Sequence, residues 1–177
     1  MTGSSDCALL VVDVQQGLFE QSTPIYRAEE LLENITSLID QAHSTNTPVF
    51  YIQHSGSNTL VRGTPHWKLH PRLQPLSMDN IVHKLHGNAF EETTLDGSLR
   101  AKNITTVVVT GLVTHGCVRA TCLGALKSGY KVILVKDAHS NFSKQAAERI
   151  DELNQKLSEK NVELRSTALV DFQKGAG

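Results

Sequence analysis

Runs of apolar, β-branched residues alternate along the chain with segments in which apolar residues recur every three to four positions. Six runs have the length and composition of strands, at residues 8–13, 49–53, 80–83, 105–110, 131–135 and 166–170, and the last is expected at a sheet edge. Residues 27–44 and 144–160 instead carry one apolar and one polar helical face. Apolar strands that alternate with helices are typical of a parallel sheet covered on both faces. The pattern therefore predicts an α/β fold.

A helix of small residues is predicted over residues 118–128, directly after the fourth strand, and Cys117 stands at its start. Unpaired backbone N–H groups and the positive end of a helix dipole favour a thiolate, and such positions lower a cysteine pKa from about 8.5. We therefore expect Cys117 to be reactive. The alternative is that Cys117 only packs in the core. Judged on the local sequence alone this role is the more frequent one, because cysteine is among the most buried residue types.

Two charged residues stand at the carboxyl ends of other predicted strands. Asp13 ends the first strand in VVDVQQ, and Lys84 ends the third in IVHK. Taken singly, Asp13 is expected to cap a turn and Lys84 to extend from the sheet rim into solvent. The carboxyl ends of parallel strands, however, meet at one edge of the sheet, where α/β proteins bind ligands. Asp13, Lys84 and Cys117 are therefore expected to converge on one crevice.

The segment of residues 54–78 has little periodicity and contains Pro65, Pro71 and Pro75. It is longer than the roughly 12–15 residues usual for a loop without secondary structure, and long loops of this kind tend to be functional. We expect it to lie over the carboxyl ends of the strands.

The composition of the 177 residues is ordinary for one globular domain, with a formal net charge of -1. This balance offers no basic surface for nucleic acid and no polybasic patch for a membrane. No apolar run reaches the roughly 20 residues of a membrane span, and the first residues lack the pattern of a signal peptide. The three cysteines are accordingly expected to be reduced thiols in a cytoplasmic protein, with Cys7 and Cys122 as packing residues.

Three segments together resemble the isochorismatase-like cysteine hydrolases, a family that includes nicotinamidases and N-carbamoylsarcosine amidohydrolases. They are VVDVQQGLF around Asp13, IVHKLHGNAFEETTL around Lys84, and VVVTGLVTHGCVRATCLGALKSGYKVILVKDA around Cys117. Their order and spacing match those of the family over nearly the whole chain. The resemblance implies one domain over residues 1–177, a three-layer α-β-α arrangement with six mostly parallel strands in the Rossmann-like order 3-2-1-4-5-6.

The same resemblance implies roles for these residues. Cys117 would be the nucleophile, Asp13 its base, and Lys84 the cation between them, a set of residue types suited to forming an acyl thioester. The resemblance also implies a cis peptide bond, for which Val113–Thr114 is the candidate. The backbone N–H groups of Thr114 and Cys117 would then form an oxyanion hole.

Two departures place the chain within the family. Metal-dependent nicotinamidases carry an Asp-x-His with a later His after the second strand, whereas residues 50–56 read FYIQHSG and lack the Asp. A site made of His54, His66 and His70 is the alternative, but their irregular spacing is more typical of hydrogen-bonding groups, so we expect no metal and no cofactor. True isochorismatases, which cleave a vinyl ether, typically lack the cysteine that is present here.

Residues 62–71, RGTPHWKLHP, resemble a loop of metal-free members in which the Trp stands beside the substrate. Trp67 is therefore a candidate pocket residue, with a loop anchor as the equal alternative. Three other candidates for the substrate pocket are Phe19, His54 and His115. Arg119 adds a cation near the predicted helix start, for a substrate carboxylate or for an acidic neighbour in an oligomer.

The expected activity is metal-independent hydrolysis of a C–N bond in a small amide, carbamoyl or ureido compound. Vinyl-ether hydrolysis is one alternative, and a non-catalytic binding protein on an enzyme fold is another. The expected partner is a small-molecule substrate, and the resemblance implies a homodimer or homotetramer.

Overall fold

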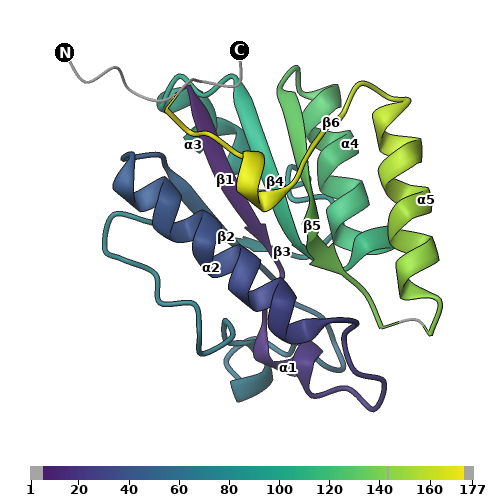
Figure 1. Ribbon diagram of the computed structural model, residues 1–177. Helices are drawn as coiled ribbons and strands as arrows, with labels where there is room; N and C mark the ends of the chain where they lie inside the picture. The colour runs from purple at the N-terminus through teal and green to yellow at the C-terminus, as the bar shows by residue number, and fades with distance from the viewer. Residues whose placement is uncertain (1–5, 143, 174–177) are drawn as a thin grey trace.

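A computed structural model describes residues 6–142 and 144–173, and a six-stranded sheet forms its centre (Figure 1). The strands are β1 (Cys7–Val12), β2 (Val49–His54), β3 (Asn80–Lys84), β4 (Thr106–Leu112), β5 (Lys131–Ser140) and β6 (Glu163–Arg165). They lie in the order β3-β2-β1-β4-β5-β6, and each neighbouring pair is parallel. The predicted fold class and strand order are confirmed, and the sheet is parallel throughout.

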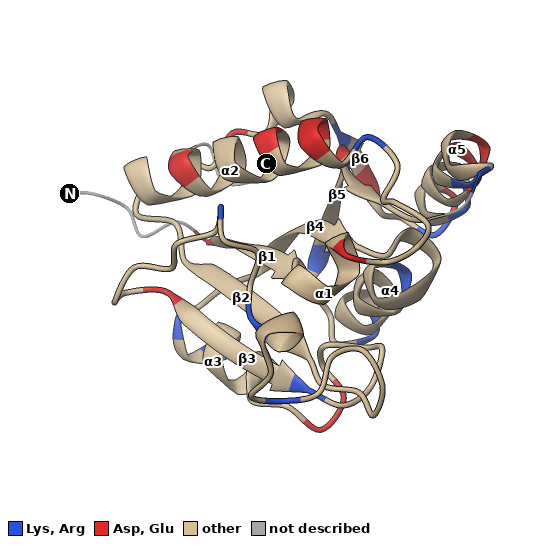
Figure 2. Cartoon of the chain, turned by 90° about the horizontal axis from the view of Figure 1, so that it is seen from below, with Lys and Arg blue, Asp and Glu red and all other residues tan. Residues whose placement is uncertain are grey.

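Helices cover both faces of this sheet, which gives the three layers visible end-on in Figure 2. The long helix α2 (Ala28–Ser44) packs on one face, where Leu31, Ile35 and Leu38 meet alternate residues of β1. The other face is covered by α3 (Leu95–Ala101), α4 (Arg119–Lys127) and α5 (Ala146–Ser158). Because β1 is buried on both faces, its sequence CALLVV is apolar at nearly every position.

The sixth strand differs from the prediction in its position. Residues 166–170 were expected to form it, but β6 is Glu163–Arg165, and Thr167–Leu169 form a short 3-10 turn. The Oδ1 atom of Asp137 accepts hydrogen bonds from the backbone N–H and the hydroxyl of Thr167, at 2.8 and 2.9 Å. These bonds stabilise a turn at Thr167 and end the strand before it.

The predicted loop does cross the carboxyl ends of the strands. The short helix α1 (Gln16–Phe19) follows β1 there, and a 3-10 turn, Pro65–Trp67, packs against it. Backbone hydrogen bonds join Gln16 N–H to Lys68 O and His70 N–H to Val14 O, each at 2.9 Å. The loop is thereby paired with the residues that follow β1.

Gly111 brings β4 unusually close to β1, just before Asp13. Its φ is +121°, and a Cβ at this position would lie 2.1 Å from the carbonyl oxygen of Val12. Only a glycine fits this backbone conformation at this separation. The close approach fixes the distance between the end of β1 and the segment that leads to Cys117.

Within the described ranges, every helix is too short or too polar to cross a membrane. The prediction about a signal peptide concerns the amino terminus, of which residues 1–5 lie outside the described residues.

Candidate active site

Asp13 is the first residue after β1, and its side chain is almost fully buried. Its backbone has φ = 51°, in the left-handed region that Asp tolerates better than most residues, and its N–H donates to Ile52 O at 2.9 Å. This turn directs the carboxylate away from the strand ladder. Asp13 retains 2% exposure, so the carboxylate requires a nearby partner.

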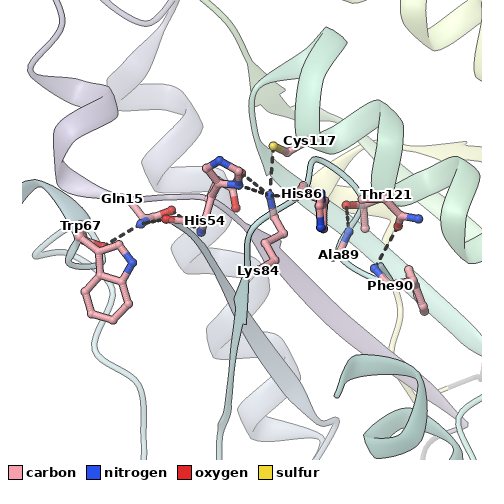
Figure 3. A network of polar contacts seen from close by, with 11 residues as sticks. Gln15, His54, Trp67, Lys84, His86, Ala89, Phe90, Cys117 and Thr121 are labelled. Atoms are coloured by element: carbon pink, nitrogen blue, oxygen red, sulfur yellow. Dashed lines mark hydrogen bonds and ion pairs between the residues drawn. The ribbon is translucent and has the colours of Figure 1, made fainter. Parts of the chain in front are cut away.

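That partner is Lys84, at the carboxyl end of β3 (Figure 3). Its buried ammonium lies 3.0 Å from Asp13 Oδ2, 3.1 Å from Cys117 Sγ, 3.2 Å from His54 Nδ1 and 3.1 Å from His86 O. An ammonium has three donors and no acceptor, so these four groups compete for three protons. Lys84 thus contacts both Asp13 and Cys117, so the three residues predicted to converge do lie together. His54 lies with them.

Cys117 lies in the turn Thr114–Val118, between β4 and α4, and the backbone of this turn is kinked at Gly116 (φ -102°, ψ -111°). The carbonyl of Val113 accepts from the N–H groups of Gly116 and Val118, at 3.0 and 3.3 Å, which closes the turn around the cysteine. The side chain of Cys117 is partly exposed, whereas Asp13 and Lys84 are buried. Of these three residues, Cys117 is therefore the one that solvent can reach.

The pKa of Cys117 differs from the sequence-based expectation. A lowered pKa was expected for Cys117, but burial, followed by the charge of Asp13, raises the pKa of the thiol to about 12. Burial also raises the pKa of Asp13, against the opposing effect of Lys84. Burial and the Lys84 cation lower the pKa of His54. The thiol therefore keeps its proton at rest, and Asp13 is a stronger base than an exposed aspartate.

The cis peptide bond joins Leu112 to Val113, one residue before the predicted Val113–Thr114 bond. That prediction was wrong because β4 runs further than expected and still pairs Leu112 with Ser140 of β5. The chain leaves the sheet only after this pair. The side chain of Thr114, the residue expected after the cis bond, is buried and points toward His139.

The three histidines considered as a metal site do not come together. His66 Nε2 lies 2.8 Å from Glu20 Oε2, and the ring of His70 packs on Phe19 with centroids 4.5 Å apart. In the part of the chain that the structure describes, the group with metal-ligand spacing is Asp13, His54 and Cys117, with ligand atoms within 4.8 Å of one another. Lys84 donates to all three, so its ammonium is the cation that these groups share.

Gln15 is a fully buried residue of the site that the sequence did not reveal. Its side-chain amide donates to His54 O at 3.0 Å and to Trp67 O at 2.7 Å, and accepts from His54 N–H at 2.8 Å. Gln53 donates a further bond to Trp67 O, at 3.1 Å. The two amides hold the loop against the ends of β1 and β2.

The ring of Trp67 is directed away from Cys117 in Figure 3. It stacks on His83, with centroids 5.2 Å apart, and its Nε1 donates to Ser55 Oγ at 3.0 Å. These contacts are those of the loop anchor considered as its alternative role. Of the other candidate pocket residues, His54 contacts Lys84, whereas Phe19 is partly exposed and His115 is exposed.

Behind the turn, a buried chain of polar groups was also missed. Thr114 Oγ1 lies 3.0 Å from His139 Nδ1, and His139 Nε2 lies 2.9 Å from Asn154 Oδ1. Since the Asn154 oxygen can only accept, Nε2 carries the proton and Nδ1 accepts from the Thr114 hydroxyl. Burial lowers the pKa of His139 to about 4, which keeps the ring neutral. Its partners lie 25 and 15 residues away, and no local sequence pattern joins them.

A hollow of about 440 Å³ opens beside the turn, on the side of Val113 and His115. The other residues that line it are Thr23, Asn141, Phe142 and Arg149. The side chains of Val113 and Phe142 are half-buried and pack against the apolar core. The hollow therefore has an apolar wall next to the turn that carries Cys117, and a charged residue at its outer side.

Comparisons with known proteins agree with the fold and identify relatives of the chain. A family model described as an Isochorismatase domain matches residues 7–160. Streptothricin hydrolase from Streptomyces noursei is 32% identical over 147 residues, which cover 82% of this chain and 53% of that protein. The chain thus spans about half the length of this relative.

Other relatives are named for amide hydrolysis or known from their structures. Maleamate amidohydrolase from Pseudomonas putida is 26% identical, over 76% of this chain and 74% of that protein. A cysteine hydrolase of known structure from Pseudomonas syringae superposes with a TM-score of 0.85 at 26% identity, over 92% of this chain and 89% of that one.

Proposed function

Because the chain belongs to the isochorismatase family, whose named relatives include amide hydrolases, we propose that it is a metal-independent cysteine hydrolase. Its substrate would be a small amide, carbamoyl or ureido compound, cleaved at a C–N bond. One observation carries the proposal: Lys84 Nζ lies 3.0 Å from the Asp13 carboxylate and 3.1 Å from the Cys117 sulfur. The cation thus lies between the proposed base and the proposed nucleophile, and the residue that carries the nucleophile is partly exposed.

In the proposed mechanism, Cys117 Sγ attacks the substrate carbonyl while its proton passes to Asp13. Asp13 then gives that proton to the leaving nitrogen, the C–N bond breaks, and an acyl thioester remains on Cys117. Water attacks the thioester, Asp13 takes the proton of the water, and the acid product leaves as the thiol is restored. The backbone N–H groups of Thr114 and Cys117 would stabilise the oxyanion in both halves.

Lys84 has two parts in this sequence. Its ammonium keeps the buried Asp13 ionised, although burial favours the protonated acid. It also stabilises negative charge on the sulfur when the thiol gives up its proton. Independence of a metal is supported by the position of this ammonium among the side chains that would otherwise be spaced to hold an ion.

The proposal is tested with a panel of small primary amides, carbamoyl amines and ureides, assayed for ammonia release and for an acyl adduct by intact mass. Cys117→Ala should abolish the adduct and lower turnover by about 10⁴-fold or more, since it removes the nucleophile. Cys122→Ala is the matched control, because Cys122 is buried on α4 and makes no contact with Asp13 or Lys84. Turnover that survives Cys117→Ala would contradict the thioester and favour vinyl-ether hydrolysis. A protein that forms no adduct and releases no ammonia would favour the binding-protein alternative.

The homodimer or homotetramer, the single domain and the cytoplasmic location remain predictions from the sequence and the family resemblance.

A further inference from the structure

Four groups surround the ammonium of Lys84, which has only three protons to donate. The Asp13 carboxylate and the His86 carbonyl, at 3.0 and 3.1 Å, can only accept, so they take two of the three. Cys117 Sγ, at 3.1 Å, and His54 Nδ1, at 3.2 Å, remain for the third. The sulfur and the imidazole nitrogen therefore compete for one proton of the ammonium.

Two neighbouring strands place the ring of His54 beside this ammonium (Figure 3). His54 lies opposite Lys84 in the register of β2 and β3, so both side chains leave the sheet on the same face. The amide of Gln15 fixes the backbone of His54, accepting from its N–H at 2.8 Å and donating to its carbonyl at 3.0 Å. The fold thus holds the ring next to Lys84 without any contribution from a substrate.

The contact with Lys84 also determines which nitrogen of the His54 ring carries the proton. Nδ1 lies 3.2 Å from an ammonium that carries only donors, so a proton on Nδ1 would set two donors against each other. Burial, followed by the charge of Lys84, lowers the pKa of His54, whereas the charge of Asp13 and the carbonyl of His86 oppose this shift. The ring is therefore neutral at neutral pH, with its proton on Nε2 and a lone pair on Nδ1.

The two competing acceptors differ in strength, and the difference reverses when Cys117 ionises. Burial and the charge of Asp13 raise the pKa of the thiol to about 12, so the sulfur is protonated at rest. A protonated thiol is a weak acceptor, and the imidazole nitrogen is then the better one. A thiolate carries a full negative charge and attracts the ammonium more strongly than a neutral ring does. The ammonium can exchange one acceptor for the other in place, because both already lie at hydrogen-bond distance.

We propose that His54 is a positioning residue: its Nδ1 accepts the third proton of the Lys84 ammonium while Cys117 is protonated, and yields it to the sulfur when the thiol ionises. The inference rests on the proposed function for the ionisation of Cys117, and it adds a fourth residue to that site. No covalent bond changes in this step, since the ammonium keeps its three protons and only the acceptor of one hydrogen bond is exchanged.

The exchange keeps the buried ammonium satisfied through the reaction. In the acyl thioester the sulfur of Cys117 is again a weak acceptor, so the third proton of Lys84 returns to His54 Nδ1. The ammonium therefore has three acceptors at every stage, and a buried donor without a partner would be costly. At rest the same contact withholds Lys84 from the sulfur, which disfavours the thiolate until Asp13 takes the thiol proton.

The test compares two substitutions of nearly equal size, His54→Asn and His54→Leu. An asparagine Oδ1 can take the position of Nδ1 and accept from Lys84, whereas leucine offers no acceptor. Alkylation of Cys117 by iodoacetamide is followed at pH 7.5, without substrate, by mass spectrometry of the peptide that contains it. His54→Leu should react about three- to tenfold faster than His54→Asn, because Lys84 then donates only to the sulfur. His54→Asn should stay within about twofold of the wild type.

The substitution Lys84→Met shows whether the ring acts through the ammonium. In this background His54→Leu and His54→Asn should be alkylated at rates within about twofold of each other, since the ammonium that an acceptor would hold is gone. A difference that persists without the ammonium would overturn the proposal. Equal rates in the protein that retains Lys84, or a slower reaction of His54→Leu, would overturn it too.

Turnover separates this inference from the proposed function. On a substrate found in the panel of amides, KM should stay within about twofold for both variants, because the ring acts on Lys84 instead of the substrate. A raised KM with unchanged alkylation would make His54 a substrate contact, the role expected from the sequence, and overturn the proposal. The expected alkylation pattern in a protein that hydrolyses none of the panel would refute the hydrolase and support the role of His54. Hydrolysis with equal alkylation of the two variants would do the reverse.

Discussion

At the scale of single residues, the pKa of the Cys117 thiol determines whether its sulfur carries a proton at rest. Burial and the carboxylate of Asp13 raise the pKa of this thiol, and the nearby ammonium of Lys84 opposes them without prevailing. The start of a helix was expected to lower this pKa and leave a useful fraction of the thiol ionised at neutral pH. That expectation considered the backbone and left out the buried carboxylate of Asp13. Asp13 is far from Cys117 in the sequence, but its carboxylate lies within 4.8 Å of the sulfur.

The same balance predicts opposite effects of one substitution on two reactions of Cys117. Asp13→Asn removes a charge that raises the thiol pKa, so iodoacetamide should alkylate Cys117 about tenfold faster at pH 7.5. Amide turnover should fall by about 10²–10⁴-fold, because the base is lost. Both rates are followed on the same preparation, by intact mass and by ammonia release.

Asp79→Asn is the control for this experiment, since Asp79 is also buried but pairs with His43, away from the triad. It should change neither rate. If Asp13→Asn slowed both alkylation and turnover, Asp13 would stabilise the thiolate instead of receiving its proton, and the proposed role would be wrong.

At the scale of elements, the site depends on how closely β4 approaches β1. Gly111 sets this approach, because a side chain there would overlap the Val12 carbonyl. Val12 directly precedes Asp13, and Gly111 lies six residues before Cys117. Asp13 and Cys117, the proposed base and nucleophile, thus follow two strands that meet at a point where only glycine fits.

Two glycine substitutions should therefore have opposite effects on stability. Gly111→Ala should lower the free energy of unfolding by about 3 kcal/mol or more, through overlap and the positive φ. Gly97→Ala, in α3, should raise it by up to about 1 kcal/mol, because the Cβ meets nothing within 4 Å and alanine favours the helix. Urea denaturation measures both. A stable Gly111→Ala variant would show that the strands can separate without cost.

The elements also show which features a sequence can reveal. Apolar strands such as β1 and the charged residues at strand ends were predictable, because burial and strand polarity act within a few residues. The end of β4 was missed, since its last pair, Leu112 with Ser140, follows a register shift that brings in a distant part of β5. The end of the sheet was missed for a similar reason: the bonds from Asp137 to Thr167 span 30 residues.

At the scale of the whole molecule, His139 links β5 of the sheet, the turn that carries Cys117, and α5 through its two ring nitrogens. The unfolded chain binds a proton to this ring near pH 6.5, whereas the folded protein resists protonation until about pH 4. Stability therefore falls as the pH drops through this window, because the unfolded state gains a proton that the folded state excludes.

Protonation of His139 at acid pH should consequently lower the free energy of unfolding of the protein. Between pH 7.5 and pH 5, the contribution of His139 should fall by about 2 kcal/mol, and His139→Gln should lose that part of the pH dependence. Asp13, whose pKa is raised, acts in the opposite direction, so the comparison is made between the two proteins in urea titrations at each pH. His66→Gln, at the exposed surface, is the control. Identical pH profiles for wild type and His139→Gln would contradict the prediction.

The anchor made by Gln15 has a consequence for how this scaffold can diversify. All three of its hydrogen bonds reach backbone atoms, two on His54 and one on Trp67. These three bonds would therefore survive a change of side chain at either position, whereas the contacts of the Trp67 ring with His83 and Ser55 would not. The loop is thus attached twice, once through backbone atoms and once through a side chain, and the first attachment does not depend on which residues stand at positions 54 and 67.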